Sequence, residues 1–428
     1  MKTLVFFSLL LLAAQVRAQT PAHAPTGLNK IATLVDLSSG SIVASTPAHP
    51  KFVTNKTFNH FAAKRQAYYL SGLNNLSLFK DFAIADVTEG ILQVGHNFTP
   101  QKEDDLTNSV FTVAVQSNIA HNVANLLAKD KLANDLGLPL SYTFFFATHA
   151  GLDSTDVDTL EMQRAFQFRL LRNKTIAELQ LLQAAATSNS AVDTVGRPLA
   201  RKEALAKAEK EFYDSELAMF EKQYPSFYTS WVRLQGFVPL SSSAYQVAPA
   251  NSMSFQEANT RKWSAGVSIG HVSENTWRWG AIFINGSARV AYTNAIEQQA
   301  DRIKGYTQYA LLNSPTPTQL YYNGDGTKVY VGDLDKQWTV PLQLQFIYLL
   351  PSRADTKVGL DIQVERYALN YTKTNFLLGI PVFLKGKEDK GVNVEAQFRW
   401  RDTDKKVLGS DRFTVGLSVA LPFGSIVK

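Results

Sequence analysis

The sequence predicts an all-β fold, a transmembrane antiparallel β-barrel of about 12–14 strands with an inserted α-helical hairpin. Three observations predict it. Apolar and polar residues alternate through the last quarter of the chain, residues 337–423. An apolar export signal occupies residues 1–18, and no later apolar run is long enough for a membrane-spanning helix. Residues 153–225 replace the alternation with helical spacing.

The alternation is clearest in the run that starts at Trp338. Apolar side chains occupy every second position from Trp338 to Leu350, and Thr339, Gln343 and Gln345 are among the residues between them. A period of two places the apolar set on one face of a strand. Runs of about ten residues have the length that a tilted strand needs to cross a bilayer.

Four further runs repeat this pattern, beginning at Val358, Phe376, Val392 and Phe413. In a membrane barrel the polar face lines an aqueous lumen, whereas in a soluble β-sandwich, the alternative fold, it contacts solvent. Opposite charges in a lumen either pair and stiffen the barrel or line a conduit. The predicted lumen-lining residues are Gln343, Gln345, Asp361, Gln363, Glu365, Asn393, Glu395, Gln397, Arg399 and Arg401.

The N-terminal region divides into two parts. Residues 1–18 are organised as a cleaved signal peptide, with Lys2 ahead of an apolar stretch and small residues before the cleavage point. Residues 19–75 are rich in proline, serine and threonine, and predict a periplasmic segment or a luminal plug in the barrel mouth. The barrel itself is expected over residues 76–428.

The helical insertion at residues 153–225 is expected to be an antiparallel hairpin, whose second helix runs over about residues 199–223. It is either a loop with its own small core or a functional element, an extracellular binding platform or a lid. Counting strands back from a periplasmic C-terminus, with one strand at residues 305–312, places this hairpin outside the cell. In that count residues 351–355 and 386–390 become tight periplasmic turns, and residues 78–86 pair with another N-terminal strand or lie outside the barrel. Residues 122–136, between two predicted strands, look helical.

Tryptophans lie at or near the ends of predicted strands. These are Trp263, Trp277, Trp338 and Trp400. Aromatic girdles at the two membrane interfaces occupy such positions, so the four residues are predicted to lie at the interface.

Composition excludes several functions. The chain has no cysteine, which rules out disulfides, thiol catalysis and cysteine-based metal sites. The net charge of +6 is spread along the chain without a basic cluster, which argues against nucleic-acid binding. We expect no cofactor and no metal.

The last strand, residues 414–421, has the order polar-x-Gly-x-x-apolar-x-apolar. Over residues 91–423 the chain resembles outer-membrane β-barrel proteins of Gram-negative bacteria as a general class. That resemblance implies a location in the cell outer membrane, contact with outer-membrane lipid, and recognition by the barrel-assembly machinery. The chain departs from the pattern because it ends in Gly-Ser-Ile-Val-Lys, without a terminal aromatic residue.

His271 and Ser273 share one face of a predicted strand and continue its lipid-facing set. The pair is similar to the His-x-Ser of barrel-type phospholipases and lipid A deacylases. This resemblance implies His271 as base and Ser273 as nucleophile, with Asn275 or Glu274 orienting the histidine. The Asn-Gly that follows in the phospholipase pattern is absent, so both are weak candidates.

The leading functional interpretation is a passive channel or transport-type barrel for small solutes, without enzymatic activity. The alternative is a surface interaction protein, a receptor or adhesin that binds an extracellular ligand through the 153–225 hairpin. The third is a lipid-modifying enzyme at His271 and Ser273. Deleting the hairpin separates the first two, because a channel still conducts whereas a binder loses its partner.

Overall fold

A computed structural model describes residues 55–426 of the chain, with gaps. The gaps are at 71–75, 88–89, 103–104, 121–122, 125–126, 129–130, 133–135, 152–161, 224–225, 249–255, 276–277, 295–302, 311–318, 324–326, 332–335, 353–355, 370–371, 386–390, 402 and 404–412, together with most of 163–195. The predicted signal peptide at residues 1–18 lies outside the described residues.

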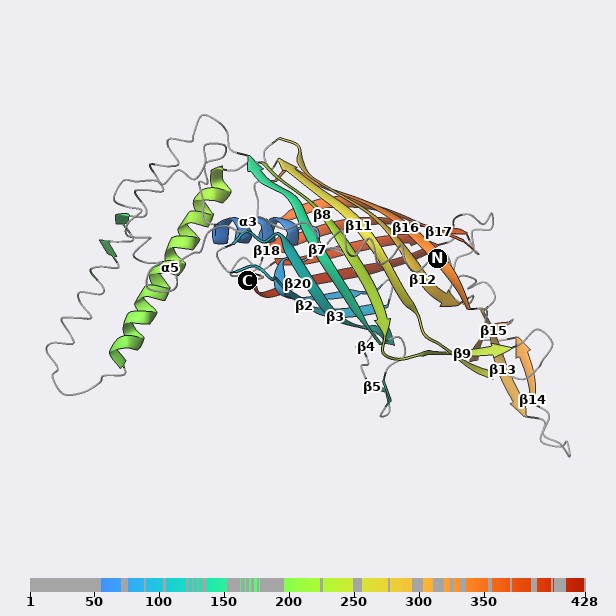
Figure 1. Cartoon of the computed structure of the whole chain (residues 1–428). Coiled ribbons are helices and arrows are strands. Elements are labelled where there is room, and N and C mark those ends of the chain that lie inside the picture. The colour runs from blue at the N-terminus through green and yellow to red at the C-terminus, as the bar shows by residue number, and fades with distance from the viewer. Residues whose placement is uncertain are drawn as a thin grey trace, which may run out of the picture. The chain divides into compact units, whose positions relative to one another are not determined.

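Twelve antiparallel strands close into a barrel (Figure 1). In ring order they are β1 (Phe79–Asp86), β2 (Ile91–Phe98), β3 (Ser109–Ala120), β7 (Gly137–Gly151), β8 (Ser226–Pro239), β11 (Trp263–Asn275), β12 (Gly280–Asn294), β16 (Lys336–Leu349), β17 (Lys357–Ala368), β18 (Lys373–Lys385), β19 (Gly391–Trp400) and β20 (Phe413–Ile426). The ring closes because β1 pairs with β20 on one side and with β2 on the other. The predicted fold class is confirmed.

Burial alternates along the strands as the sequence predicts. In β16 the even-numbered side chains are exposed, like Leu342 and Leu344, or partly exposed, whereas Gln343 and Gln345 are buried. The same alternation exposes Val364 in β17. The outer wall is therefore apolar and the inner wall is polar towards the loop end of these strands, the pattern of a barrel that stands in a lipid bilayer.

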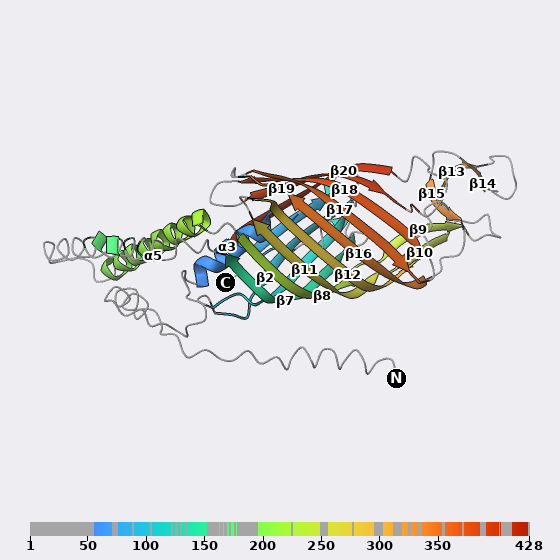
Figure 2. The ribbon, with the colours of Figure 1, turned by 90° about the horizontal axis from the view of Figure 1, so that it is seen from above.

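The two ends of the barrel differ. At the terminal end, where β1 begins and β20 ends, Phe79 pairs with Ile426. At the opposite end, called the loop end below, long connections leave the barrel at residues 240–262 and 295–335. These contain a separate five-stranded sheet of β9 (Ser243–Ala248), β10 (Gln256–Thr260), β13 (Ile303–Ala310), β14 (Gln319–Asn323) and β15 (Thr327–Val331), which lies beyond the strand ends (Figure 2).

One barrel strand and one helix were assigned wrongly from the sequence. Residues 305–312, expected in the barrel, fall largely in β13 of the separate sheet, whereas residues 78–86 supply the barrel strand β1. Residues 122–136 read as helical, but their described parts form the short strands β4 (Val123–Ala124), β5 (Leu127–Ala128) and β6 (Lys131–Leu132). Alternation marks extended chain but does not reveal which sheet a strand joins.

Replacing the expected strand at 305–312 by the strand at 78–86 keeps the count at twelve. Every connection that lies between these two strands in the sequence then falls at the opposite end of the barrel from the one expected. The 153–225 insertion joins the fourth ring strand, β7, to the fifth, β8, so it leaves the barrel at the terminal end. It shares that end with the turns at 350–356 and 386–390, which were expected opposite the insertion. The expectation that the insertion and these connections lie at opposite ends of the barrel was therefore wrong.

Helix α3 (Asn55–Ala67) lies within the barrel mouth at the terminal end (Figure 1). Phe61 packs on Phe227 of β8, with ring centroids 5.5 Å apart, and the Asn393 amide of β19 donates to the Ala67 carbonyl. β8 and β19 are opposite each other in the ring, with five strands between them on either side. The segment from Phe61 to Ala67 therefore crosses the barrel.

The insertion is helical where the structure describes it. α5 (Gly196–Gln223) corresponds to the predicted second helix, and Lys174, also helical, contacts Glu211 at 2.6 Å. Most of the predicted first helix lies outside the described residues. Within the described part of the chain, no helix is both long and apolar enough to span a membrane.

Candidate functional site in the barrel lumen

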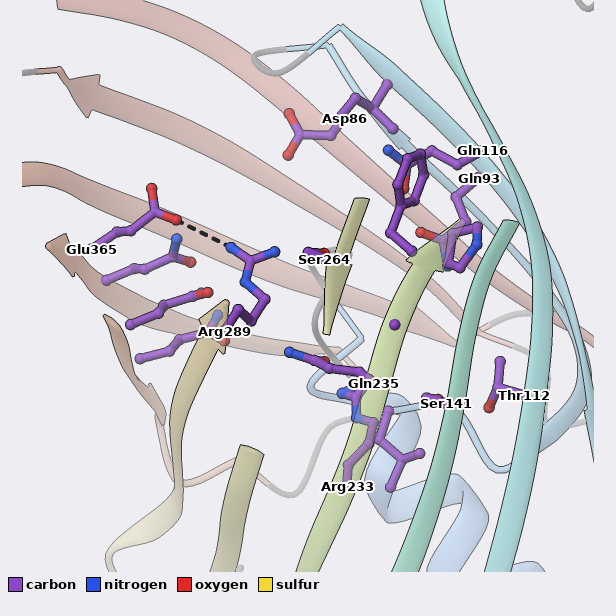
Figure 3. Close-up of a pocket in the computed structure, with 18 of the residues that line it drawn as sticks. Asp86, Gln93, Thr112, Gln116, Ser141, Arg233, Gln235, Ser264, Arg289 and Glu365 are labelled. Carbon is purple, nitrogen blue, oxygen red and sulfur yellow. Dashed lines mark hydrogen bonds and ion pairs between the residues drawn. The ribbon is translucent and has the colours of Figure 1, made fainter. Parts of the chain in front are cut away.

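A cavity of about 430 Å³ occupies the lumen towards the loop end (Figure 3). Its lining comes from nearly every strand of the barrel, including Phe237 near the end of β8 and Ser264 at the start of β11. Period-two alternation explains this convergence, because it turns one side chain in two towards the axis on every strand.

Charged side chains of both signs line the cavity. The acidic ones are Asp86, Asp361, Glu365 and Glu395, and the basic ones are Arg233, Lys262, Arg289 and Arg399. Arg289 Nη2 of β12 lies 3.2 Å from Glu365 Oε1 of β17, reaching across β16 (Figure 3). Asn375 donates to the other oxygen of Glu365 at 3.0 Å. Part of this charge is therefore neutralised within the wall.

Asp361 and Glu395 meet above a glycine. Glu395 on β19 is 1% exposed and hydrogen-bonds Asp361 on β17, although β18 lies between the two strands. The position between them on β18 is Gly379, where a Cβ would overlap Glu395 Oε1. Gln345 Nε2 also donates to Asp361 at 2.7 Å. Glycine at 379 therefore leaves room for the two carboxyl groups to approach each other along the lumen wall.

The lumen is filled at the terminal end. Phe61 of α3 packs against Phe220 of α5 at 4.7 Å and Phe227, while Tyr69 stacks on Phe283 of β12 at 5.5 Å. The cluster continues with Trp231, Val272, Ile347, Leu349 and Phe383, all buried. Side chains from α3 and from the inner wall therefore close this end with an apolar layer.

One ion pair anchors α3 inside that layer. Arg65 Nη1 lies 2.5 Å from Glu274 Oε1 of β11, and the two side chains are 9% and 3% exposed. The guanidinium also lies over the rings of Phe61 and Tyr68, at 4.8 and 5.8 Å. A buried pair of this kind fixes the position of α3, because moving either partner leaves a buried charge uncompensated.

Eight of the ten residues predicted from sequence to line the lumen border the cavity. They are Gln343, Gln345, Asp361, Gln363, Glu365, Glu395, Gln397 and Arg399. Asn393 also points inward but contacts Ala67 of α3 below the cavity. Arg401 follows the last residue of β19 and is exposed, outside the cavity lining.

Sequence reasoning missed much of the opposite wall. Arg233 and Gln235 on β8, Arg289 on β12, and Gln93 and Gln116 on β2 and β3 all line the cavity. The alternation around Arg233 and Gln235, between Val232, Leu234 and Gly236, was the signal that could have identified them. α3 was also missed, although Phe58, Phe61, Ala62 and Arg65 recur at helical spacing.

Three of the four tryptophans predicted at strand ends are described, and all lie at the loop end. Trp263 and Trp338 are 4.4 Å apart between ring centroids, and Tyr292 packs against both. Trp400 packs between Phe376 and Phe413. Two clusters of aromatic side chains therefore lie on this rim. Trp277 lies outside the described residues.

His271 does not contact Ser273. Its Nδ1 lies 2.8 Å from Oγ of Ser230 on the neighbouring strand β8. Neither expected orienting residue is turned towards the histidine, because Glu274 points inward to Arg65 and the Asn275 side chain accepts from the Arg278 backbone. No group of three metal-binding side chains occurs in the described part of the chain.

The closed ring, the apolar outer wall and the polar lumen together define an outer-membrane-type β-barrel protein. No protein-family model matches the chain, and no curated protein matches it in sequence. Nine solved chains match in structure. The NanC porin has a TM-score of 0.28 and 5% identity, covering 80% of this chain and 98% of its own. The β domain of the Bordetella autotransporter BrkA has a TM-score of 0.25 and 10% identity, covering 77% and 88%.

Proposed function

We propose that this protein is an outer-membrane channel for small solutes that α3 holds closed. The supporting observation is that α3 crosses the lumen from β8 to β19 and completes an apolar layer at the terminal end. A polar cavity lies on the loop side of that layer. Solutes reach this cavity from the loop end, and passage through the barrel requires α3 to move.

The height of the apolar outer wall supports a location in the outer membrane. On β16, Trp338 at the loop-end rim and Tyr348 near the terminal end are ten positions apart. A strand rising about 3.3 Å per residue and tilted about 45° covers roughly 23 Å over that length, close to the height of an outer-membrane apolar band. Trp263, Trp338 and Trp400 then lie at one interface.

The orientation follows from connection lengths. Four of the five connections at the terminal end are short, at 99–108, 276–279, 350–356 and 386–390, and the fifth is the 152–225 insertion. The loop end has three long connections, at 121–136, 240–262 and 295–335, beside shorter ones at 87–90, 369–372 and 401–412. Because outer-membrane barrels have short periplasmic turns, the terminal end faces the periplasm. Export there by the signal peptide at residues 1–18 and folding by the barrel-assembly machinery are part of the proposal.

The experiment uses the absence of cysteine from the chain. The double variant Ala67→Cys with Asn393→Cys joins α3 to β19 where the two residues already touch. In planar bilayers the oxidised form should stay closed, and reduction should restore the parental openings. A variant in which residues 55–70 are replaced by a Gly/Ser linker should conduct continuously. Each single cysteine variant is the control.

An unchanged conductance after replacement of residues 55–70 would overturn the proposal, as would equal opening of the oxidised and reduced forms. Ion conductance tests the channel itself and needs no knowledge of the natural solute.

A second candidate function is an interaction role for the insertion on the periplasmic side. It is supported by three contacts between α3 and the last turns of α5. Thr57 donates to Glu216 at 2.5 Å, Lys64 pairs with Glu221 at 2.5 Å, and Lys56 lies over the Tyr213 ring. A partner that moves α5 would move α3. Replacing residues 160–190 by a short linker should then leave barrel folding intact. It should abolish the change in channel conductance that periplasmic extract causes in the parental protein.

A further inference from the structure

We propose that the luminal cavity binds a neutral polyhydroxylated solute, of the size of a mono- or disaccharide, in preference to an ion. This inference rests on the proposed function and names its substrate class. The volume of about 430 Å³ lies within the range of small-molecule sites.

Amide side chains dominate the polar part of the wall. Seven glutamines line the cavity: Gln93, Gln116, Gln235, Gln343, Gln345, Gln363 and Gln397. An amide offers two donors and an acceptor without net charge, which matches a hydroxyl group that both donates and accepts. Ser141, Ser264 and Thr112 add hydroxyl groups of their own (Figure 3).

Charge gives the cavity no strong preference for an ion. Four acidic and four basic side chains line it, so their formal charges cancel. Arg289 and Glu365 pair with each other, and Asp361 hydrogen-bonds Gln345 and Glu395. An anion or a cation entering the site meets both signs at once, whereas a neutral solute meets oriented donors and acceptors.

Two opposite walls of the cavity contain buried amide atoms that have no hydrogen-bond partner among the described residues. Gln235 Nε2 on β8 and Gln397 Oε1 on β19 are buried without a hydrogen-bond partner there, and Gln397 is 3% exposed. β8 and β19 face each other across the barrel. Buried polar groups are normally satisfied, so a donor and an acceptor on facing walls indicate a hydrogen-bonding guest between them.

Aromatic surface completes the match. Phe237 lies near the end of β8, Tyr367 near the end of β17, and both line the cavity towards the loop end. The C–H faces of a sugar ring pack on such rings while its hydroxyl groups reach the amides.

The test is calorimetric titration of the full chain in a detergent without a sugar headgroup. The probes are sucrose and glucose, compared with gluconate as an anionic analogue and glucosamine as a cationic one. Sucrose or glucose should bind at least tenfold more tightly than either charged analogue. The double variant Gln235→Leu with Gln397→Leu should weaken that binding by about tenfold or more, since each lost buried partner costs about 1 kcal/mol.

The matched control is Asn285→Leu. Asn285 is a buried amide with both polar atoms unsatisfied among the described residues, but it does not line the cavity. This variant should leave sugar affinity unchanged. Equal or tighter binding of gluconate or glucosamine, no binding of either sugar, or equal losses in the control and the double variant would each overturn the proposal.

The two proposals fail separately. If removal of α3 opens an ion-conducting pore but neither sugar binds, the solute class is wrong and the channel stands. If sucrose binds through Gln235 and Gln397 but no variant conducts, the binding site stands and the channel is wrong.

Discussion

Arg65 of α3 and Glu274 of β11 form a 2.5 Å ion pair inside the barrel wall, 209 residues apart in sequence. This ion pair joins α3, the helix that crosses the lumen, to a strand of the lumen wall. Because both charges are buried, the pair holds α3 at one depth and one rotation in the barrel mouth.

Arg65→Met should loosen α3 by about 3–5 kcal/mol, since it leaves Glu274 buried without its cation. Adding Glu274→Gln should recover part of that loss, because the buried charge is then removed. The measurement is the rate of trypsin cleavage after Lys64, a side chain that is 7% exposed while α3 is docked. The exposed pair Lys174–Glu211 supplies the control, and Lys174→Met should not change this rate. Cleavage of Arg65→Met at the parental rate would contradict the prediction.

Phe61→Ala should release α3 by a different mechanism. Phe61 is fully buried and packs edge-on against Phe220 and Phe227, so truncation leaves a cavity and costs about 3–5 kcal/mol. Phe58→Ala is the comparison, because Phe58 is only partly buried and lies farther from Phe220, at 6.2 Å. We expect Phe61→Ala to raise open probability in planar bilayers well above Phe58→Ala. Similar openings in the two variants would show that the aromatic cluster does not hold α3.

Gly379→Ala should destabilise the barrel by about 1–3 kcal/mol, because the added methyl group overlaps Glu395 Oε1 and displaces its contact with Asp361. Combining it with Glu395→Ala should restore most of the loss. Gly286→Ala is the control, since a Cβ there meets nothing within 4 Å. The readout is the temperature at which the folded, fast-migrating form unfolds on semi-native gels. A loss in Gly286→Ala as large as in Gly379→Ala would point to a general strand effect.

Acid should loosen the insertion at one identifiable contact. A hydrogen bond from Lys174 holds the pKa of Glu211 below its ordinary value of 4.5. A lowered folded-state pKa contributes stability that is present above pH 4.5 and is lost as pH falls through the folded-state pKa. Hydrogen exchange around Glu211, normalised to intrinsic rates, should therefore accelerate below about pH 4.5. Lys174→Ala should remove that pH dependence; if the dependence persists, the contact is not its source.

Period-two alternation was enough to predict the barrel and most of the polar residues of one wall. Gln343, Asp361 and Gln397 could be placed because a strand turns alternate side chains to one face whatever its neighbours are. The opposite wall, with Arg233 and Arg289, follows the same rule and was within reach of it. His271 shows the limit, because its partner Ser230 is set by register between β8 and β11 and not by spacing along one strand.

By itself, the sequence determined that this protein is an antiparallel barrel of about 12–14 strands with an apolar exterior, a polar interior and a helical insertion. Those properties follow from local periodicity, which every segment carries independently of the rest. Only the tertiary structure decided that 78–86 and not 305–312 completes the ring, which end bears the insertion, and that α3 crosses the lumen. Such features depend on pairings such as Phe79 with Ile426 and Arg65 with Glu274, and long-range contacts leave no periodic trace in the chain.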